Sequence, residues 1–165
     1  MRTVFLVAVG FMLAAPSGAA AQTKISGTSQ CGKPDPQHIV PAGDQASHSF
    51  SISKLKCTWP KPFELAGVSV KDDELTVFEE VTGSTASDRT FVVGTMANGD
   101  KIFVRAQGKA VIKDGAVQSG EGTWTYVGGT GKFKGLKGKG AYKSDGTTTQ
   151  IEGEYQLGPS AKPKT

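Results

Sequence analysis

The sequence contains little of the material from which metal and nucleophile sites are usually built. It has two cysteines and two histidines, and neither cysteine has a histidine at a metal-ligand spacing. No Gly-x-Ser-x-Gly elbow is present, and a Ser-His-Asp triad cannot be assembled from spacing alone. His38 and His48, ten residues apart in the sequence, are weak evidence for a metal. We therefore predict neither a metal nor a cofactor.

Arginine is also scarce, since beyond Arg2 the sequence has Arg89 and Arg105. A surface that binds nucleic acid normally carries arginines interleaved with exposed aromatic residues. A local basic cluster does exist, but lysines of this kind usually belong to solvated strand edges and turns. The formal net charge of +4 is modest, and we predict no nucleic-acid partner. The cluster consists of Lys132, Lys134, Lys137, Lys139 and Lys143.

Long apolar runs are missing except at the N-terminus. Arg2 precedes an apolar run of about a dozen residues, and small residues follow as far as Ala21. This order is typical of a secretory signal peptide that is cleaved after Ala21. The run is shorter than the roughly 20 residues that a membrane-spanning helix needs, although an uncleaved anchor is the alternative. We predict a signal peptide over residues 1–21, a secreted or periplasmic protein, and no membrane span after cleavage.

Export agrees with the cysteine content. Cys31 and Cys57 both follow the predicted signal peptide, and an oxidising compartment favours a disulfide between them. The alternative is that the two cysteines bind a metal or that one of them is a thiol nucleophile. Closing a loop of this length would stabilise the fold by about 3.5 kcal/mol in the chain-entropy model.

Residues 22–47 are rich in Pro, Gly, Ser and Asp, which predicts an extended N-terminal arm with one short strand near residues 23–29. Apolar and polar residues then alternate with a period of two, which indicates β-strands. The length suits one domain. We predict an all-β domain over residues 48–158, followed by a flexible tail over residues 159–165.

Tight turns separate the alternating segments. Sustained helical periodicity is absent, apart from a single helical turn near residues 132–136. Several strands of 8–12 residues joined by hairpin turns are typical of a sandwich or a barrel. The turns are expected at Gly83-Ser84, Asn98-Gly99, Asp114-Gly115 and Asp145-Gly146.

Glycines recur beside aromatic residues on single strand faces. Each such glycine lets a strand bend and leaves room for a ring from a neighbouring strand. The pattern favours one antiparallel barrel of about eight strands over a flat sandwich, which is the alternative. The three faces are Gly120, Gly122, Trp124 and Tyr126; Gly138, Gly140 and Tyr142; and Ile151, Gly153, Tyr155 and Leu157.

Residues 123–138 read TWTYVGGTGKFKGLKG. The segment resembles the allene oxide cyclase and dirigent-type barrels, in which a strand runs into Gly-Gly-[Ser/Thr]-Gly-x-Phe-x-Gly and then a Gly-bearing strand. Residues 75–80 resemble the apolar-aromatic-Glu strand of the cyclases, and the order of the two segments suits that family. Similar barrels occur in small secreted bacterial proteins. The resemblance spans residues 75–157 and implies an eight-stranded, calycin-type barrel whose lumen holds an elongated apolar molecule. Such barrels commonly form trimers, so the resemblance allows an oligomer.

The glycines at residues 128–131 also suggest a phosphate-binding loop, because glycine-rich turns expose backbone N–H groups to anions. The Gly-Lys-Ser/Thr ending and the βαβ unit that such a loop needs are both missing. We therefore predict a tight turn whose Phe133 plugs one end of the barrel.

Glu79 is the candidate site residue. Alternation places it on the face of Val77 and Val81, where an unpaired charge would cost several kcal/mol unless it finds a partner or holds its proton. A carboxyl group in this position is a candidate general base or an anchor for the polar end of a ligand. The alternative is a residue at the barrel mouth that pairs with Arg89 or Arg105. In the cyclases the matching glutamate lies in the cavity and an Asn two residues later holds a water, whereas Val81 stands at that position here.

The predicted ligand-binding residues are Glu79, Val77, Val81, Trp124, Tyr126, Tyr142 and Tyr155. The four aromatic residues either line the lumen or simply fill it as core. Glu121, Glu152 and Glu154 are expected on the outer wall as partners of Lys139 and Lys143.

Three functions remain open at this stage. The leading hypothesis is a non-enzymatic barrel that binds a small apolar or amphiphilic molecule, with Glu79 near the polar end. The second is an isomerase or cyclase that acts on an oxygenated lipid, with Glu79 as the candidate catalytic residue. The third is a structural or partner-binding module whose barrel is filled by side chains.

Overall fold

The computed structural model describes residues 22–158. The predicted signal peptide (residues 1–21) and tail (residues 159–165) lie outside the described residues. Within the described part, no helix has the length and apolar character needed to cross a bilayer. The elements are β1 (Thr23–Cys31), β2 (Gln37–Pro41), β3 (His48–Thr58), β4 (Glu64–Leu65), β5 (Val68–Thr82), β6 (Thr85–Met96), β7 (Lys101–Lys113), β8 (Ala116–Gly129), the 3-10 turn η1 (Gly131–Phe133), β9 (Leu136–Ser144) and β10 (Thr148–Leu157).

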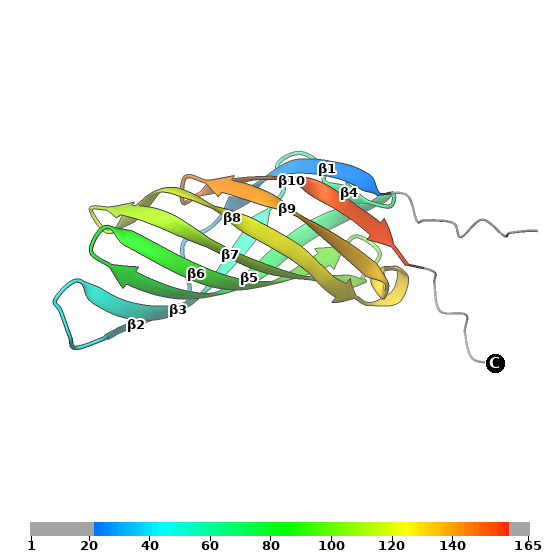
Figure 1. Ribbon diagram of the computed structural model, residues 1–165. Coiled ribbons are helices and arrows are strands. Elements are labelled where there is room, and N and C mark those ends of the chain that lie inside the picture. The colour runs from blue at the N-terminus through cyan, green and yellow to red at the C-terminus, as the bar shows by residue number, and fades with distance from the viewer. Residues whose placement is uncertain (1–21, 159–165) are drawn as a thin grey trace, which may run out of the picture.

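Eight of the strands form a closed antiparallel ring in the order β3-β1-β10-β9-β8-β7-β6-β5, and β5 pairs with β3 to complete it (Figure 1). The prediction of a single antiparallel barrel of eight strands is therefore confirmed, and the flat sandwich is excluded. Closure is uneven around the ring. Strands β1 and β3 pair only through Gln30 with Thr58 and Cys31 with Cys57.

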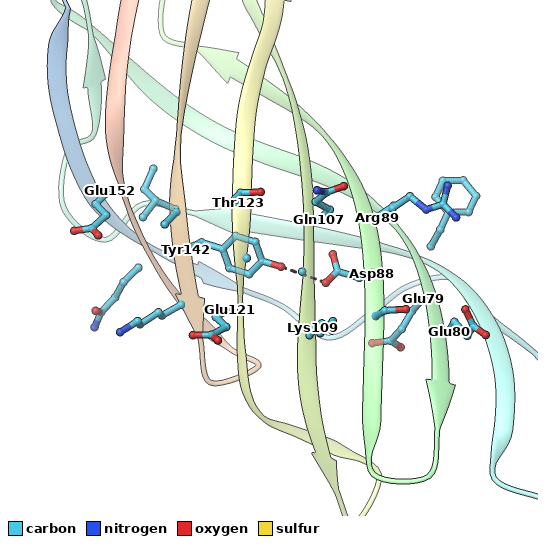
Figure 2. Close-up of a pocket in the computed structure, with 18 of the residues that line it drawn as sticks. Glu79, Glu80, Asp88, Arg89, Gln107, Lys109, Glu121, Thr123, Tyr142 and Glu152 are labelled. Atoms are coloured by element: carbon cyan, nitrogen blue, oxygen red, sulfur yellow. Dashed lines mark hydrogen bonds between the residues drawn. The ribbon is translucent and has the colours of Figure 1, made fainter.

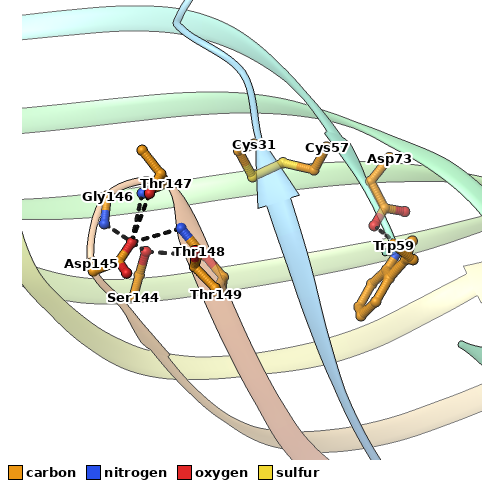
Figure 3. Close-up of a disulfide and its surroundings, with 10 residues drawn as sticks. All are labelled: Cys31, Cys57, Trp59, Asp73, Ser144, Asp145, Gly146, Thr147, Thr148 and Thr149. Atoms are coloured by element: carbon orange, nitrogen blue, oxygen red, sulfur yellow. Dashed lines mark hydrogen bonds between the residues drawn. A yellow bond between two sulfur atoms is a disulfide. The ribbon is translucent and has the colours of Figure 1, made fainter. Parts of the chain in front are cut away.

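The disulfide lies at this seam, because Cys31 and Cys57 are cross-strand partners and their sulfur atoms are bonded (Figure 3). The predicted disulfide is thus present, and no free cysteine occurs among the described residues. The bridge joins the two strands with the shortest pairing in the ring, so it reinforces the closure covalently.

The segment predicted as an extended arm is instead part of the sheet. Strand β1 pairs with β10 from Thr23 to Gln30, which makes it a full member of the ring. Strand β2 pairs with the part of β3 that β1 does not reach, and the β2–β3 hairpin extends beyond the barrel (Figure 1). The barrel therefore begins at residue 23 rather than at residue 48. The backbone groups of β1 find their hydrogen-bond partners in β10, more than 100 residues away in the sequence. The composition of residues 22–47 alone does not predict this pairing.

The predicted hairpin turns all join consecutive strands. Asp114 and Gly115 both have positive φ, at 52° and 74°, which is the conformation of a type I′ turn whose twist matches the flanking strands. The turn at Gly83-Ser84 pairs Thr82 with Thr85. This pairing fixes the register of β5 against β6 and so determines which inward side chains of the two strands meet.

One half of the barrel is closed by packed side chains. The predicted plug is confirmed, since Phe133 on η1 is fully buried in a core that includes Trp124 and Tyr126. The glycines make room as expected. A Cβ at Gly140 would lie 2.4 Å from Cζ2 of Trp124, so only a glycine lets the indole ring lie against β9. The other buried members of this core are Phe63, Leu65, Val70, Met96, Ile102, Leu136 and Tyr155.

Candidate functional site

The other half of the barrel contains an open cavity of about 1410 Å³ (Figure 2). Its volume exceeds the range of about 300–1,000 Å³ that small-molecule sites usually occupy, because part of it opens to solvent. The alternative in which side chains fill the whole barrel therefore holds for one half only. The inward residues that line the cavity are Gly27, Ser51, Glu79, Asp88, Gly108, Gly122, Tyr142 and Ile151.

Two carboxylates lie side by side on the inner wall. Glu79 of β5 and Asp88 of β6 are cross-strand partners, and both face the cavity. Ser51 donates a hydrogen bond to Oε2 of Glu79 over 3.4 Å, and Thr90 donates one to Oδ2 of Asp88 over 2.9 Å. These contacts confirm the prediction that Glu79 faces the interior. Partial burial, with a further contribution from the charge of Asp88, raises the pKa of Glu79.

Tyr142 reaches the same place along the inner wall from β9, which β8 and β7 separate from β6. It lies on β9, yet its hydroxyl group donates a hydrogen bond to Oδ1 of Asp88 over 3.2 Å (Figure 2). The side chain therefore crosses β8 and β7 along the inner wall. A Cβ at Gly108 would lie 2.1 Å from the Tyr142 hydroxyl oxygen, so the missing side chain at this position is what lets the phenol pass. Burial, followed by the charge of Asp88, raises the pKa of Tyr142.

The predicted alternative for Glu79, an ion pair with Arg89 or Arg105, is wrong. Arg89 is the cross-strand partner of Phe78, and Arg105 that of Phe91, which places both guanidinium groups on the outer wall. The ion pairs among the described residues join His48 to Asp44 and Glu80, and Lys54 to Glu74. The carboxylates of the cavity therefore have neutral hydrogen-bond donors rather than a basic partner.

His48 ties the loop of the β2–β3 hairpin to β5. Its Nδ1 lies 2.7 Å from Oδ1 of Asp44, and its Nε2 lies 3.1 Å from Oε1 of Glu80. The hydrogen bond with Asp44, and then that with Glu80, raises the pKa of His48. Within residues 22–158 no group of three or more His, Cys, Asp or Glu side chains is arranged so that it could hold a metal ion.

The outer-wall acids lie where alternation places them. Glu121 is the cross-strand partner of Lys143, and Glu154 that of Lys139. Glu152 lies opposite Ala141, between the two lysines. None of these pairs is an ion pair within 4 Å among the described residues.

The predicted ligand-binding residues divide into two groups. Glu79 and Tyr142 line the cavity, with Val77 and Val81 flanking Glu79 on the same face of β5. The other three predicted residues belong to the closed half, where they pack in the buried core. These three are Trp124, Tyr126 and Tyr155.

Asp88, Ser51 and Thr90 were not predicted from the sequence. A signal for Asp88 was present, because the turn at Gly83-Ser84 pairs Thr82 with Thr85, and three further steps along each strand bring Glu79 to Asp88.

A further carboxyl group is buried in the closed half. Asp73 is 8% exposed, and it accepts a hydrogen bond from Nε1 of Trp59 over 2.9 Å (Figure 3). Burial is the main cause that raises the pKa of Asp73 to about 6, and the charge of Asp72 adds to it. The group lies among core side chains rather than in the open cavity.

The strand pairings and the cavity define a class: an antiparallel eight-stranded barrel that is packed at one end and open at the other. No protein-family model matches the chain, and no curated protein matches it. Among solved structures, the chain is similar to a pterocarpan synthase dirigent protein, with 15% identity, a TM-score of 0.48 and coverage of 92% of this chain and 100% of that chain.

Proposed function

We propose that the protein binds a small amphiphilic molecule in the open half of its lumen, with the polar end beside Glu79 and Asp88. The observation that carries this proposal is the cavity of about 1410 Å³ with two inward carboxylates at one place on its wall. A cavity with few convergent polar groups is the usual form of a ligand site. No catalytic step is required of it.

Small inward side chains support an apolar body for the ligand. Strand β7 presents Ala106, Gly108 and Ala110 to the interior, and β5 presents Val77 and Val81 on either side of Glu79. These side chains are small and apolar, so they leave space for an acyl chain or a ring system. Burial of such a group would contribute about 25 cal/mol of binding free energy for each Å² of apolar surface removed from water.

We also propose that the protein works in an oxidising compartment, either outside the cell or in the periplasm. The disulfide between Cys31 and Cys57 is consistent with such a location, because disulfides persist in exported proteins. The sequence features of residues 1–21 support the same proposal.

Native mass spectrometry of the protein purified without detergent tests the proposal. We expect extra mass that is lost on denaturation, and displacement of a fluorescent fatty-acid probe by the released molecule. Glu79→Gln should weaken the binding of that molecule and leave the fold intact. The matched control is Glu154→Gln, which removes the same charge from the outer wall. If the protein carries no adduct and binds no probe, the proposal is wrong.

A second candidate is an isomerase or cyclase that acts on an oxygenated lipid. It is favoured by the convergence of Glu79, Asp88 and Tyr142 in one cavity, because a carboxyl group with a raised pKa, such as Glu79, can exchange protons with a substrate bound there. Although Val81 supplies no polar partner to Glu79, Ser51 on the neighbouring strand does. Turnover of a fatty-acid epoxide that is lost in Glu79→Ala would support this function over binding alone.

A further inference from the structure

The inner wall of the barrel carries acidic groups and no basic ones. Among the described strands of the ring, the inward positions hold Asp73, Glu79 and Asp88, and no lysine, arginine or histidine occupies an inward position. The basic side chains of the same strands alternate onto the outer wall, as Lys109 and Lys143 do. The lumen therefore carries negative charge, and none of the ion pairs among the described residues includes one of these inward carboxylates.

The two carboxylates of the cavity lack a counter-ion. Their hydrogen-bond donors are the hydroxyl groups of Ser51, Thr90 and Tyr142, which carry no charge. Two like charges on adjacent strands repel each other, and burial strengthens the repulsion because it replaces water by a medium of lower dielectric constant. The raised pKa of Glu79 is consistent with this strain on the ionised pair.

A cation would relieve the repulsion. Placed between Glu79 and Asp88, a positively charged N–H group would donate charge-assisted hydrogen bonds to both carboxylates and would restore charge balance in the lumen. An anionic head group, such as a carboxylate, would add a third negative charge to the same place. The hydroxyl groups of Ser51 and Tyr142 could not offset that charge, because both already donate to the carboxylates.

Resting on the proposed function of the same cavity, we propose that the polar end of the ligand is a cation, and that the ligand class is an aliphatic amine. The ammonium group lies between Glu79 and Asp88, and the hydrocarbon part lies along the glycine- and alanine-rich inner wall of β7 and β8.

A head-group series tests the proposal on the unmodified protein. Octylammonium, octanol and octanoate share one chain and differ in charge, and each is titrated by calorimetry at concentrations at which it is dissolved as a monomer. We expect octylammonium to bind at least about tenfold more tightly than octanol, which corresponds to about 1.4 kcal/mol, and octanoate to bind most weakly. Glu79→Gln with Asp88→Asn should remove the preference, whereas Glu154→Gln should preserve it.

The outcomes separate the two proposals. If the three compounds bind equally, or octanoate binds best, the cationic ligand class is wrong while the lumen remains a binding site. If octylammonium keeps its advantage in the double variant, its site lies elsewhere and the assignment to this cavity fails. If neither these compounds nor the fatty-acid probe binds, the proposed function itself fails. The ranking of the three compounds is measured on the unmodified protein, so the test of the ligand class does not depend on how the variants fold.

Discussion

The buried carboxyl group of Asp73 should make the stability of the barrel depend on pH. Its pKa is about 6 in the folded protein, against an ordinary value of 3.8, and burial is the main cause. As the pH rises from 3.8 to 6, the unfolded chain loses this proton while the folded barrel retains it. The folded state is therefore favoured at low pH, and that advantage disappears as the pH rises through 6.

The size of the effect follows from the two pKa values. The gap between 3.8 and about 6, at about 1.36 kcal/mol per pH unit, amounts to about 3 kcal/mol. No discount for solvent is needed, since Asp73 is 8% exposed. In Asp73→Asn the amide oxygen can still accept the hydrogen bond from Trp59, and the charge is gone. Relative to the native protein, the variant should gain about 3 kcal/mol of stability between about pH 3.5 and about pH 7.5.

Urea unfolding at a series of pH values measures this difference, with tryptophan fluorescence as the signal. Both tryptophans, Trp59 and Trp124, pack in or against the buried core, so unfolding changes their surroundings. Other titrating groups cancel when the two proteins are compared at each pH. Asp114→Asn is the control, because it removes a carboxylate from an exposed turn position, and Asn also tolerates the positive φ found there. A stability difference between Asp73→Asn and the native protein that stays constant with pH would refute the reasoning.

Two further predictions concern the seam and the cavity wall. The double variant Cys31→Ser with Cys57→Ser should lose about 3.5 kcal/mol of unfolding free energy, because the disulfide closes a sequence separation of 26. The rate of amide hydrogen exchange should then rise first at the β1–β3 seam. Equal increases in β7 and β8 would contradict the role of the seam. Gly108→Ala should lower stability by about 1–3 kcal/mol in thermal unfolding, because its methyl group would collide with Tyr142. Gly32→Ala is its control, since the nearest atom to a Cβ there lies at an ordinary 3.7 Å.

Local patterns were sufficient to predict most of the barrel. The alternation over residues 48–58 matches β3, and the dipeptides Asn98-Gly99 and Asp114-Gly115 lie at the hairpins that join β6 to β7 and β7 to β8. These features depend on short-range chemistry: side chains alternate with a period of two, and a tight turn needs residues that accept positive φ. Glu79 was predicted for the same reason, since its face follows from its neighbours on one strand.

Long-range pairing could not be predicted in this way. Strand β1 joins the ring because its backbone pairs with β10, and neither segment carries a local signal for the other. The path of Tyr142 is similar, because its bond to Asp88 crosses two intervening strands. Such contacts depend on how the sheet curls, and this is determined by the whole set of registers rather than by any one segment.

The division of the barrel into a packed half and an open half follows from the inner face of β8. Along that face, Gly120 and Gly122 are succeeded by Trp124 and Tyr126, so the side-chain volume rises abruptly within one strand. The aromatic rings pack against glycines of β9 and fill the lumen, whereas the two glycines of β8 lie opposite the small residues of β7 and leave it empty. Tyr142 preserves the space, because its ring lies along the wall over Gly122 rather than across the lumen. The boundary between core and cavity thus lies between Gly122 and Trp124, and the acidic pair lies on its open side.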